Sequence, residues 1–306
     1  MKVWLVGEGY WGKKISDTLK EFPDKIDVQV IDTKQGKTLH DISTKDPVIL
    51  ATPLWQHYEQ VLHLLHEGHD VFVEKPMAQI TAQLKSIELN LKDQVLMVGH
   101  IFMYNPLLKT LKELIENETL GDLKFIESRR LNWGIRQTKT TPTLSLAPHD
   151  ISILRYLLGD INVTYATTQN YSDNQVYDSI TFGGNNFETK CSWWWPTRER
   201  IITLIGNKAQ AIWNEDLKII GIKHGYLEDN GYPCKKIKQE IIKCNSPKTP
   251  LYLELEHFID CVKNRKTPIT DIKNAFGVGK NIDQITNILS GEKNLDQVKL
   301  EKTALK

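Results

Sequence analysis

The sequence predicts an α/β domain with a doubly wound parallel sheet, followed by an α+β domain with an open, mostly antiparallel sheet. Three observations predict this fold class. A glycine-rich loop follows the first apolar run. Short apolar runs then alternate with helical patterns as far as about residue 103, and later strand-like runs succeed one another across turn residues. A chain of 306 residues has room for two cores, and we place the domains at residues 1–103 and 104–306.

The first element is the apolar run of residues 3–6, which suits a buried parallel strand. It leads into Gly-Glu-Gly-Tyr-Trp-Gly at residues 7–12, and a helical pattern begins at Lys13. Between a strand and a helix, such glycines let the backbone approach a pyrophosphate, and the helix N-terminus favours its negative charge. The loop therefore predicts a dinucleotide-binding site. The alternative is a glycine-rich turn in an unrelated α/β domain.

The second strand, residues 28–31, ends at Asp32. A carboxylate at this place can accept hydrogen bonds from the adenosine ribose, and it repels a 2′-phosphate. Asp32 therefore favours NAD as the cofactor. Lys34 follows closely enough in sequence to counter that repulsion, so NADP stays open as a second cofactor.

The remaining strands of this domain are predicted at residues 48–51, 71–73 and 94–98. A helix follows the first of them and ends at Gly68, with an apolar face formed by Leu54, Tyr58, Val61, Leu62 and Leu65. Strands joined by helices imply a parallel sheet.

Three polar segments, Thr52-Pro53, Glu74-Lys75-Pro76 and Gly99-His100, directly follow these strands. Ligands bind at the carboxyl ends of strands in an open α/β sheet, so the segments should face the cofactor. A lysine there can hydrogen-bond a substrate hydroxyl and stabilise the alkoxide that forms as hydride leaves. Lys75 is thus a candidate catalytic residue, and the alternative is a solvated loop lysine beside a turn proline.

The second domain begins at Asn105-Pro106, a helix N-cap followed by proline at the first helical position. One helix, residues 149–158, is closed by Gly159, and two more are expected at 251–263 and 274–290. The strand-like runs are linked mostly by turn residues, which predicts antiparallel pairing, and they occupy 123–131, 161–170, 176–182, 186–195, 199–206 and 209–214.

The composition is ordinary for a soluble enzyme, with 40% hydrophobic and 25% charged residues. A net charge of +1 gives no reason to expect a nucleic-acid or anionic-membrane partner. No apolar run approaches the ~20 residues of a membrane span, and the chain opens on its first strand, so we expect neither a membrane segment nor a signal peptide. The four cysteines lack Cys-x-x-Cys spacing, which indicates reduced thiols in a cytoplasmic protein without structural zinc.

Four motifs occur in order: Gly-x-Gly-x-x-Gly at residues 7–12, Ala-Thr-Pro at 51–53 with His57, Glu-Lys-Pro at 74–76 and Asn-Pro at 105–106. Together they resemble the Gfo/Idh/MocA family, named for glucose–fructose oxidoreductase and inositol dehydrogenase. The resemblance covers nearly the whole chain, through further segments at 146–154, within 195–206 and at 257–259. It implies a Rossmann domain, a C-terminal open sheet that is largely antiparallel, and NAD(P)-dependent oxidoreductase activity.

The resemblance also implies the residues of the site. Lys75 and His149 would flank the substrate carbon presented to the nicotinamide, with His149 as general acid/base because its ordinary pKa of about 6.5 suits proton transfer near neutral pH. The alternative for His149 is a structural histidine that caps a helix. The residues expected at the cofactor are Gly7, Gly9, Tyr10, Trp11, Gly12, Asp32, Thr52, Pro53, His57, Glu74 and Lys75. The residues expected at the substrate are Lys75, His100, Tyr104, Asn105, Arg136, Ser145 and His149.

One departure from the family's pattern bears on catalysis. Many relatives carry an aspartate four residues before the histidine, where this chain has Ser145. Serine cannot supply the charge of a carboxylate, and Asp150 would point elsewhere on the helix. The acid/base set is therefore weakened or assembled differently, or the site has been given over to binding.

Three other clusters have simpler interpretations. His63, His66 and His69 have a spacing that could suggest a metal, but no carboxylate or cysteine completes the shell, so we expect solvated surface and no metal site. The three tryptophans at 193–195 suit a core or a subunit interface, with a substrate wall as the alternative. The third cluster consists of Arg129, Arg130 and Arg136. These arginines could bind a phosphate through bidentate hydrogen bonds, or they could lie exposed on an edge strand.

We therefore expect a cytoplasmic NAD(P)-dependent oxidoreductase that acts on a secondary alcohol of a sugar or sugar nucleotide. The run at residues 146–154 is most similar to family members that oxidise nucleotide-linked amino sugars in surface-polysaccharide pathways. A homo-oligomer through the C-terminal sheet is expected as well. The alternatives are a same-fold oxidoreductase with a non-sugar substrate, such as a small diol or a linear tetrapyrrole, and a catalytically silent dinucleotide-binding regulatory protein.

Overall fold

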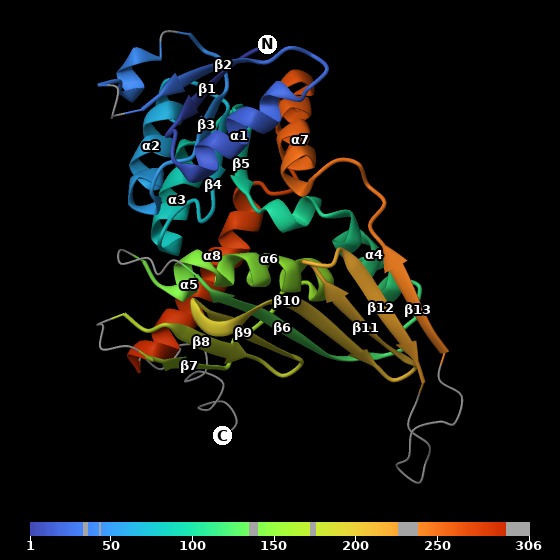
Figure 1. Cartoon of the computed structure of the whole chain (residues 1–306). Helices are drawn as coiled ribbons and strands as arrows, with labels where there is room; N and C mark the ends of the chain where they lie inside the picture. The colour runs from blue at the N-terminus through green and yellow to red at the C-terminus, as the bar shows by residue number, and fades with distance from the viewer. Residues whose placement is uncertain (33–35, 43, 135–139, 172–175, 226–237, 292–306) are drawn as a thin grey trace. The chain divides into compact units, whose positions relative to one another are not determined.

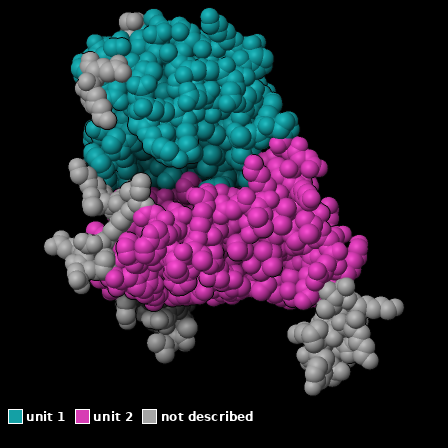
Figure 2. Space-filling view, viewed as in Figure 1, with its two compact units in different colours: residues 1–105, 247–280 teal, residues 106–246, 281–306 magenta. Residues whose placement is uncertain are grey.

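The computed structural model describes the chain except for residues 33–35, 43, 135–139, 172–175, 226–237 and 292–306 (Figure 1). The chain divides into two compact units, shown in two colours in Figure 2. The first unit comprises residues 1–105 and 247–280, and the second unit comprises residues 106–246 and 281–306. In the part of the chain that the structure describes, no helix is long and apolar enough to cross a membrane.

The first unit contains a five-stranded sheet with the strand order β2-β1-β3-β4-β5, paired in parallel throughout. Its strands are β1 (Lys2–Val6), β2 (Asp27–Ile31), β3 (Val48–Leu50), β4 (Val71–Glu74) and β5 (Leu96–Gly99). Its helices are α1 (Tyr10–Lys20), α2 (Leu54–His66), α3 (Thr81–Asn90) and α7 (Pro250–Asn264), with the short 3-10 helices η2 (Leu39–Asp41) and η3 (Ile101–Tyr104). The predicted parallel sheet is thereby confirmed.

Both faces of this sheet are covered, because successive side chains of a strand point to opposite sides. Ile49 and Phe72 belong to a core that includes residues of α1 and α7, whereas Val73 belongs to a second core with α2 and α3. Phe72 contacts Phe258 of α7, with ring centroids 5.7 Å apart. The apolar face of α7 thus brings residues 247–280 back to the first unit, which differs from the continuous first domain predicted at residues 1–103.

The second unit is built on an eight-stranded sheet with the order β13-β12-β11-β10-β6-β9-β8-β7. Its strands are β6 (Leu123–Trp133), β7 (Tyr165–Gln169), β8 (Ser179–Gly183), β9 (Phe187–Ser192), β10 (Trp194–Gly206), β11 (Ala209–Asn214), β12 (Ile219–His224) and β13 (Lys238–Lys243). The strands pair antiparallel except for β6 with β9, which confirms the predicted mostly antiparallel sheet. Its helices are α4 (Pro106–Glu116), α5 (Pro142–Ser145) and α6 (Ala147–Leu158), and α8 (Ile272–Ser290) runs from the first unit into the second.

Besides the two short 3-10 helices, four of these elements were not predicted individually: α3, α5, β12 and β13. The α3 helix buries only Leu84 and Ile87, so its apolar stripe is narrow. The β13 strand lies at the sheet edge, with most of its side chains at least partly exposed, which leaves a weak period-2 pattern. In addition, the run at 161–170 becomes a strand only from Tyr165.

A buried charge cluster joins α6 to the sheet. Asp150 of α6 accepts hydrogen bonds from Arg130 Nε at 2.6 Å and from Ser128 Oγ at 2.5 Å. Arg130 also lies 3.5 Å from a carboxylate oxygen of Glu215. The Arg130 side chain is buried, so it has a structural role and does not bind a phosphate. It does not lie on an edge strand either, because β6 lies between β10 and β9.

Candidate functional site

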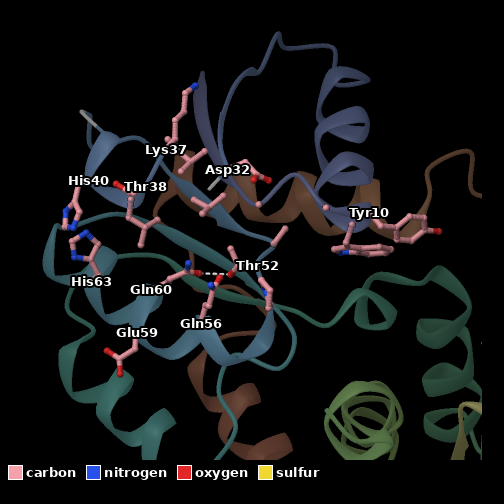
Figure 3. A pocket seen from close by; sticks show the side chains of 18 residues that line it. Tyr10, Asp32, Lys37, Thr38, His40, Thr52, Gln56, Glu59, Gln60 and His63 are labelled. Carbon is pink, nitrogen blue, oxygen red and sulfur yellow. Dashed lines mark hydrogen bonds between the residues drawn. The ribbon is translucent and has the colours of Figure 1, made fainter. Parts of the chain in front are cut away.

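A cavity of about 860 Å³ in the first unit is lined from the ends of β1, β2 and β3 (Figure 3). The segment around η2 and one face of α2 complete its lining. Carboxyl ends of parallel strands are where open α/β sheets bind ligands. Several residues expected at the cofactor line this cavity, namely Gly7, Gly9, Tyr10, Trp11, Asp32, Thr52 and Pro53.

The glycine loop has a backbone suited to a phosphate. Gly7 has a φ of +94°, and a Cβ at Gly12 would come within 2.0 Å of the Gly7 carbonyl oxygen, so the turn itself requires both glycines. A Cβ at Gly9 would meet no heavy atom within 4 Å, which leaves open space above that residue. Gly9 precedes α1, whose first turn has no side-chain cap, so its N–H groups can bind an anion.

Asp32 lies at the end of β2 and lines the same cavity (Figure 3). Its Oδ2 accepts a hydrogen bond from the backbone N–H of Glu8 at 2.8 Å. This bond fixes the carboxylate beside the glycine loop, where the ribose hydroxyls of a dinucleotide can reach it.

The cavity extends to residues that no sequence motif predicts. His40 and His63 meet edge to face with ring centroids 5.2 Å apart, and Thr52 Oγ1 donates to Gln60 Oε1 at 2.6 Å (Figure 3). The helical period could have revealed part of this lining, since four residues of α2 share one face that begins beside Thr52. The residues missed include Lys37, Thr38, Leu39, His40, Gln56, Glu59, Gln60 and His63.

Glu74 ends β4 and lies beside two residues of the same unit. Its Oε1 accepts a hydrogen bond from the indole N–H of Trp11, and a Cβ at Gly99 would come within 3.3 Å of its carboxyl carbon. Burial raises the pKa of Glu74 to about 7, although the charge of Lys75 and the Trp11 N–H both act to lower it. Glu74 therefore titrates near neutral pH, directly before Lys75 in the chain.

A second buried carboxyl group, Glu254, comes from α7. Its side chain is fully buried, and neither carboxyl oxygen has a hydrogen-bond partner among the described residues. Burial, followed by the charge of Glu74, raises the pKa of Glu254 well above its ordinary value. Burial therefore favours the neutral, protonated form of Glu254.

His57 lies on α2 and contacts the backbone of two loops. Its Nδ1 lies 2.8 Å from the carbonyl oxygen of Pro76, and its Nε2 lies 2.8 Å from the carbonyl oxygen of Thr52. The side chain is 1% exposed. Burial is the main cause that lowers the pKa of His57, the charge of Lys75 lowers it further, and the two carbonyl oxygens raise it.

The residues that follow β5 are mostly buried. Burial, with the charge of Lys75 as the second cause, lowers the pKa of His100 to about 3, so its ring is neutral at physiological pH. The Tyr104 hydroxyl lies 2.9 Å from Thr270 Oγ1 inside the first unit. Asn105 is half-buried at the end of the first segment of that unit.

The other predicted substrate residues belong to the second unit. Ser145 ends α5, and its Oγ donates to the carbonyl oxygen of Thr141 at 2.9 Å. His149 is half-buried in the first turn of α6, and the carboxylate of Asp150 is directed instead to Arg130. Arg136 lies outside the described residues. Since Lys75 belongs to the first unit, its approach to His149 is part of the functional proposal.

The three histidines at 63, 66 and 69 have different surroundings. His63 lines the cavity, and His66 is exposed with Nε2 2.8 Å from Asn90 Oδ1. His69 is buried with Nδ1 2.9 Å from the carbonyl oxygen of Asp46, so the expectation of a solvated surface is wrong for it. The described residues contain no group of three or more His, Cys, Asp or Glu side chains arranged to hold a metal.

The tryptophans at 193–195 lie where β9 leads into β10 of the second sheet, and Arg129 lies on β6. Trp193 is buried and Trp194 is exposed. Trp194 stacks on Trp133 of β6, with ring centroids 4.6 Å apart. Arg129 forms a partly exposed ion pair with Glu199 at 3.1 Å.

Comparison with known proteins gives a consistent picture. A family model described as an oxidoreductase family with an NAD-binding Rossmann fold matches residues 12–100. The model of the corresponding C-terminal alpha/beta domain matches residues 112–287. Together the two matches cover most of the chain.

Individual relatives are distant in sequence. A 2,7-anhydro-N-acetylneuraminate hydratase of Mediterraneibacter gnavus is 23% identical, over 67% of this chain and 64% of its own length. A scyllo-inositol 2-dehydrogenase (NAD(+)) of Bacillus subtilis is 25% identical, over 74% of this chain and 70% of its own. In fold, the chain is similar to a UDP-N-acetylglucosamine 3-dehydrogenase of Acidithiobacillus ferrooxidans, with a TM-score of 0.79, 15% identity and coverage of 95% and 98% of the two chains.

Proposed function

Because the chain belongs to the Gfo/Idh/MocA family of NAD-binding oxidoreductases, we propose that it transfers a hydride between NAD and a secondary alcohol or ketone of a sugar or sugar nucleotide. The observation that carries this proposal is the cavity of the first unit. It combines open space above Gly9, an uncapped helix start and a fixed carboxylate at Asp32. These groups suit the pyrophosphate and the ribose of a dinucleotide.

In this proposal, Lys75 and His149 act on one substrate hydroxyl. The bound nicotinamide supplies the hydride chemistry. Lys75 directly follows β4, so its ammonium group can hydrogen-bond the hydroxyl oxygen and stabilise the developing alkoxide. His149 takes up the hydroxyl proton, and its place in the first turn of α6 favours the neutral, proton-accepting ring.

Within the proposed substrate class, we favour a sugar nucleotide over a free sugar. Two facts support it: the segment at 146–154 resembles members that oxidise nucleotide-linked sugars, and a UDP-N-acetylglucosamine 3-dehydrogenase shares this fold. The scyllo-inositol dehydrogenase among the relatives supports a polyol more generally. The domain roles follow from this, with the dinucleotide in the first unit and substrate selection in the second.

We also propose that the chain forms a homo-oligomer through its second sheet. Ile212, Gly221 and Ile241 are neighbours in register across β11, β12 and β13. Ile212 is 48% exposed and Ile241 is 64% exposed, so this row presents apolar surface on strands near the sheet edge. Sedimentation of the wild type beside Ile212→Lys tests this, and the variant is expected to dissociate.

The deciding experiment is a panel of sugar nucleotides, free sugars and polyols, tested with purified protein and NAD while the absorbance of reduced nicotinamide is followed. Lys75→Ala and His149→Ala should each lower turnover by ~10²–10⁴-fold, the usual contribution of a positioned acid or base, and retain NADH binding. Normal turnover by both variants would show that the catalytic residues lie elsewhere.

One feature favours a second function, namely that a serine, Ser145, stands where the resemblance to the family implies an aspartate of the acid/base set. In that case the chain binds a dinucleotide and a sugar without turnover. Tight NADH binding combined with no hydride transfer across the whole panel would support this binding function over the enzyme.

A further inference from the structure

His57 joins two loops that come from different strands. Thr52 lies in the loop after β3, and Pro76 lies in the loop after β4, next to Lys75. Each of their carbonyl oxygens is 2.8 Å from one ring nitrogen of His57. Because the ring is buried, solvent does not replace either contact.

The chemistry of the ring limits what these two contacts can be. A neutral imidazole carries one N–H donor and one nitrogen lone pair, whereas an imidazolium carries two donors. A carbonyl oxygen is only an acceptor, so the neutral ring can donate to Thr52 or to Pro76 but not to both. The protonated ring donates to both, and therefore holds the two loops at once.

The charge of Lys75 opposes that second state. It lowers the pKa of His57, in addition to burial, and Lys75 is the charged side chain that acts on His57 within the described part of the chain. The two groups are therefore linked: a positive charge on one disfavours a positive charge on the other.

We propose that His57 is a positioning residue that clamps the Thr52 loop to the Lys75–Pro76 loop, and that loss of the positive charge of Lys75 favours the protonated ring that donates to both loops. The catalytic meaning of this clamp rests on the proposed function, whereas the linkage itself is a property of the first unit.

The chain supplies a matched control in His69. It is buried in the same unit, and among the described residues its ring contacts a single backbone carbonyl, that of Asp46, 2.9 Å from Nδ1. His69 therefore needs a single donor, which the neutral ring provides.

The first test measures histidine titration by NMR in the full chain, with ring resonances assigned through bonds to the backbone. The samples are the wild type, Lys75→Met and Lys75→Arg. In Lys75→Met we expect the pKa of His57 to rise by about one pH unit, the usual effect of a near charge, with His69 unchanged and Lys75→Arg like the wild type. An equal pKa of His57 in the wild type and Lys75→Met, or an equal rise at His69, would overturn the linkage. This measurement needs no substrate, so it stays decisive if the proposed activity fails.

The second test compares His57→Gln with His69→Gln. A glutamine amide has one oxygen and one nitrogen, so it cannot donate in both directions. We expect His57→Gln to keep NADH affinity within about threefold by calorimetry and to lose about 10–100-fold in kcat, because misplacing a catalytic group by about 1 Å has effects of this size. His69→Gln should keep wild-type kcat. Equal kcat in the two variants, with both folded and binding NADH, would remove the positioning role.

Discussion

Gly7, Gly9 and Gly12 share one loop but meet different physical demands. Gly7 needs its positive φ, and Gly12 leaves no room for a Cβ against the Gly7 carbonyl oxygen. Gly9 has open space and a φ of −67°, which any residue can adopt. The fold therefore does not require glycine at position 9, whereas a ligand close to the backbone does.

We expect Gly9→Ala to fold normally and to weaken NADH binding by about tenfold or more, because its methyl group enters the space of the pyrophosphate. Gly12→Ala should instead lower the stability of the first unit. Calorimetry with NADH and thermal unfolding of the two variants separate these effects. Unchanged NADH affinity in Gly9→Ala would contradict the placement of the dinucleotide.

Ser145 stands where the resemblance to the family implies an aspartate, and its hydroxyl has a local role in the structure. Its Oγ donates to the Thr141 carbonyl oxygen and closes the short α5 helix. An aspartate at this position would lose that donor and add a charge one turn before His149.

In an active enzyme, Ser145→Asp should stabilise the protonated ring of His149 and raise its pKa. The limb of the pH–rate profile that needs the neutral ring is then expected to move to higher pH by about one unit. Profiles of the wild type and Ser145→Asp on one sugar-nucleotide panel measure this. Activity in neither protein, with NAD binding intact in both, would sink the enzyme proposal.

Among the elements, α7 supplies both an apolar side chain and a buried carboxyl group to the first sheet, whose strands precede it by well over a hundred residues. Phe258 packs on Phe72, and Glu254 lies one helical turn earlier on the same face of α7. Glu74 lies two residues after Phe72 on β4, hence on the same face of the sheet. This arrangement explains why the charge of Glu74 acts on Glu254 and raises its pKa.

The buried carboxyl of Glu254 should make stability depend on pH. Its pKa is raised in the folded chain, so above about pH 4.5 the unfolded chain releases a proton that the folded chain retains, and stability falls as the pH rises. Glu254→Gln removes this loss. We expect the variant to match the wild type near pH 4.5 and to exceed it at pH 8, by about 1.4 kcal/mol for each pH unit over which the two states differ by one proton.

Denaturant unfolding at pH 5 and pH 8 measures this difference. Glu256→Gln is the matched control, because Glu256 is an exposed residue of the same helix, paired with Lys248. A gap between wild type and Glu254→Gln that is equal at both pH values would show that Glu254 is ionised when buried.

For the whole molecule, the preference for NAD or NADP should be visible in how much each cofactor stabilises the folded protein. Ligand at 100 times its Kd stabilises the folded state by about 2.7 kcal/mol. Asp32 repels a 2′-phosphate, so NADH should raise the melting temperature more than NADPH at equal concentration, and Asp32→Ala should narrow the gap. Thermal unfolding with each cofactor checks this. A larger rise with NADPH would show that Asp32 does not face the ribose and that Lys37 and His40 govern this end of the cavity.

The features that local patterns encode could be predicted from the sequence alone. The run at 3–6, the glycines and Asp32 predicted a nucleotide cavity, because a βαβ unit places these residues together through short-range geometry. Alternation and turn residues likewise predicted the second sheet. Such signals depend only on neighbours along the chain.

Which distant residues share a core or form an ion pair could be read only from the folded structure. The return of α7 to the first sheet, the Asp150–Arg130 pair and the two carbonyl partners of His57 all join separate segments. No local period marks such contacts, since they depend on which faces of packed elements meet. For the same reason Arg130 proved structural and His69 proved buried, because burial is a property of the packed fold and not of a residue's position in the chain.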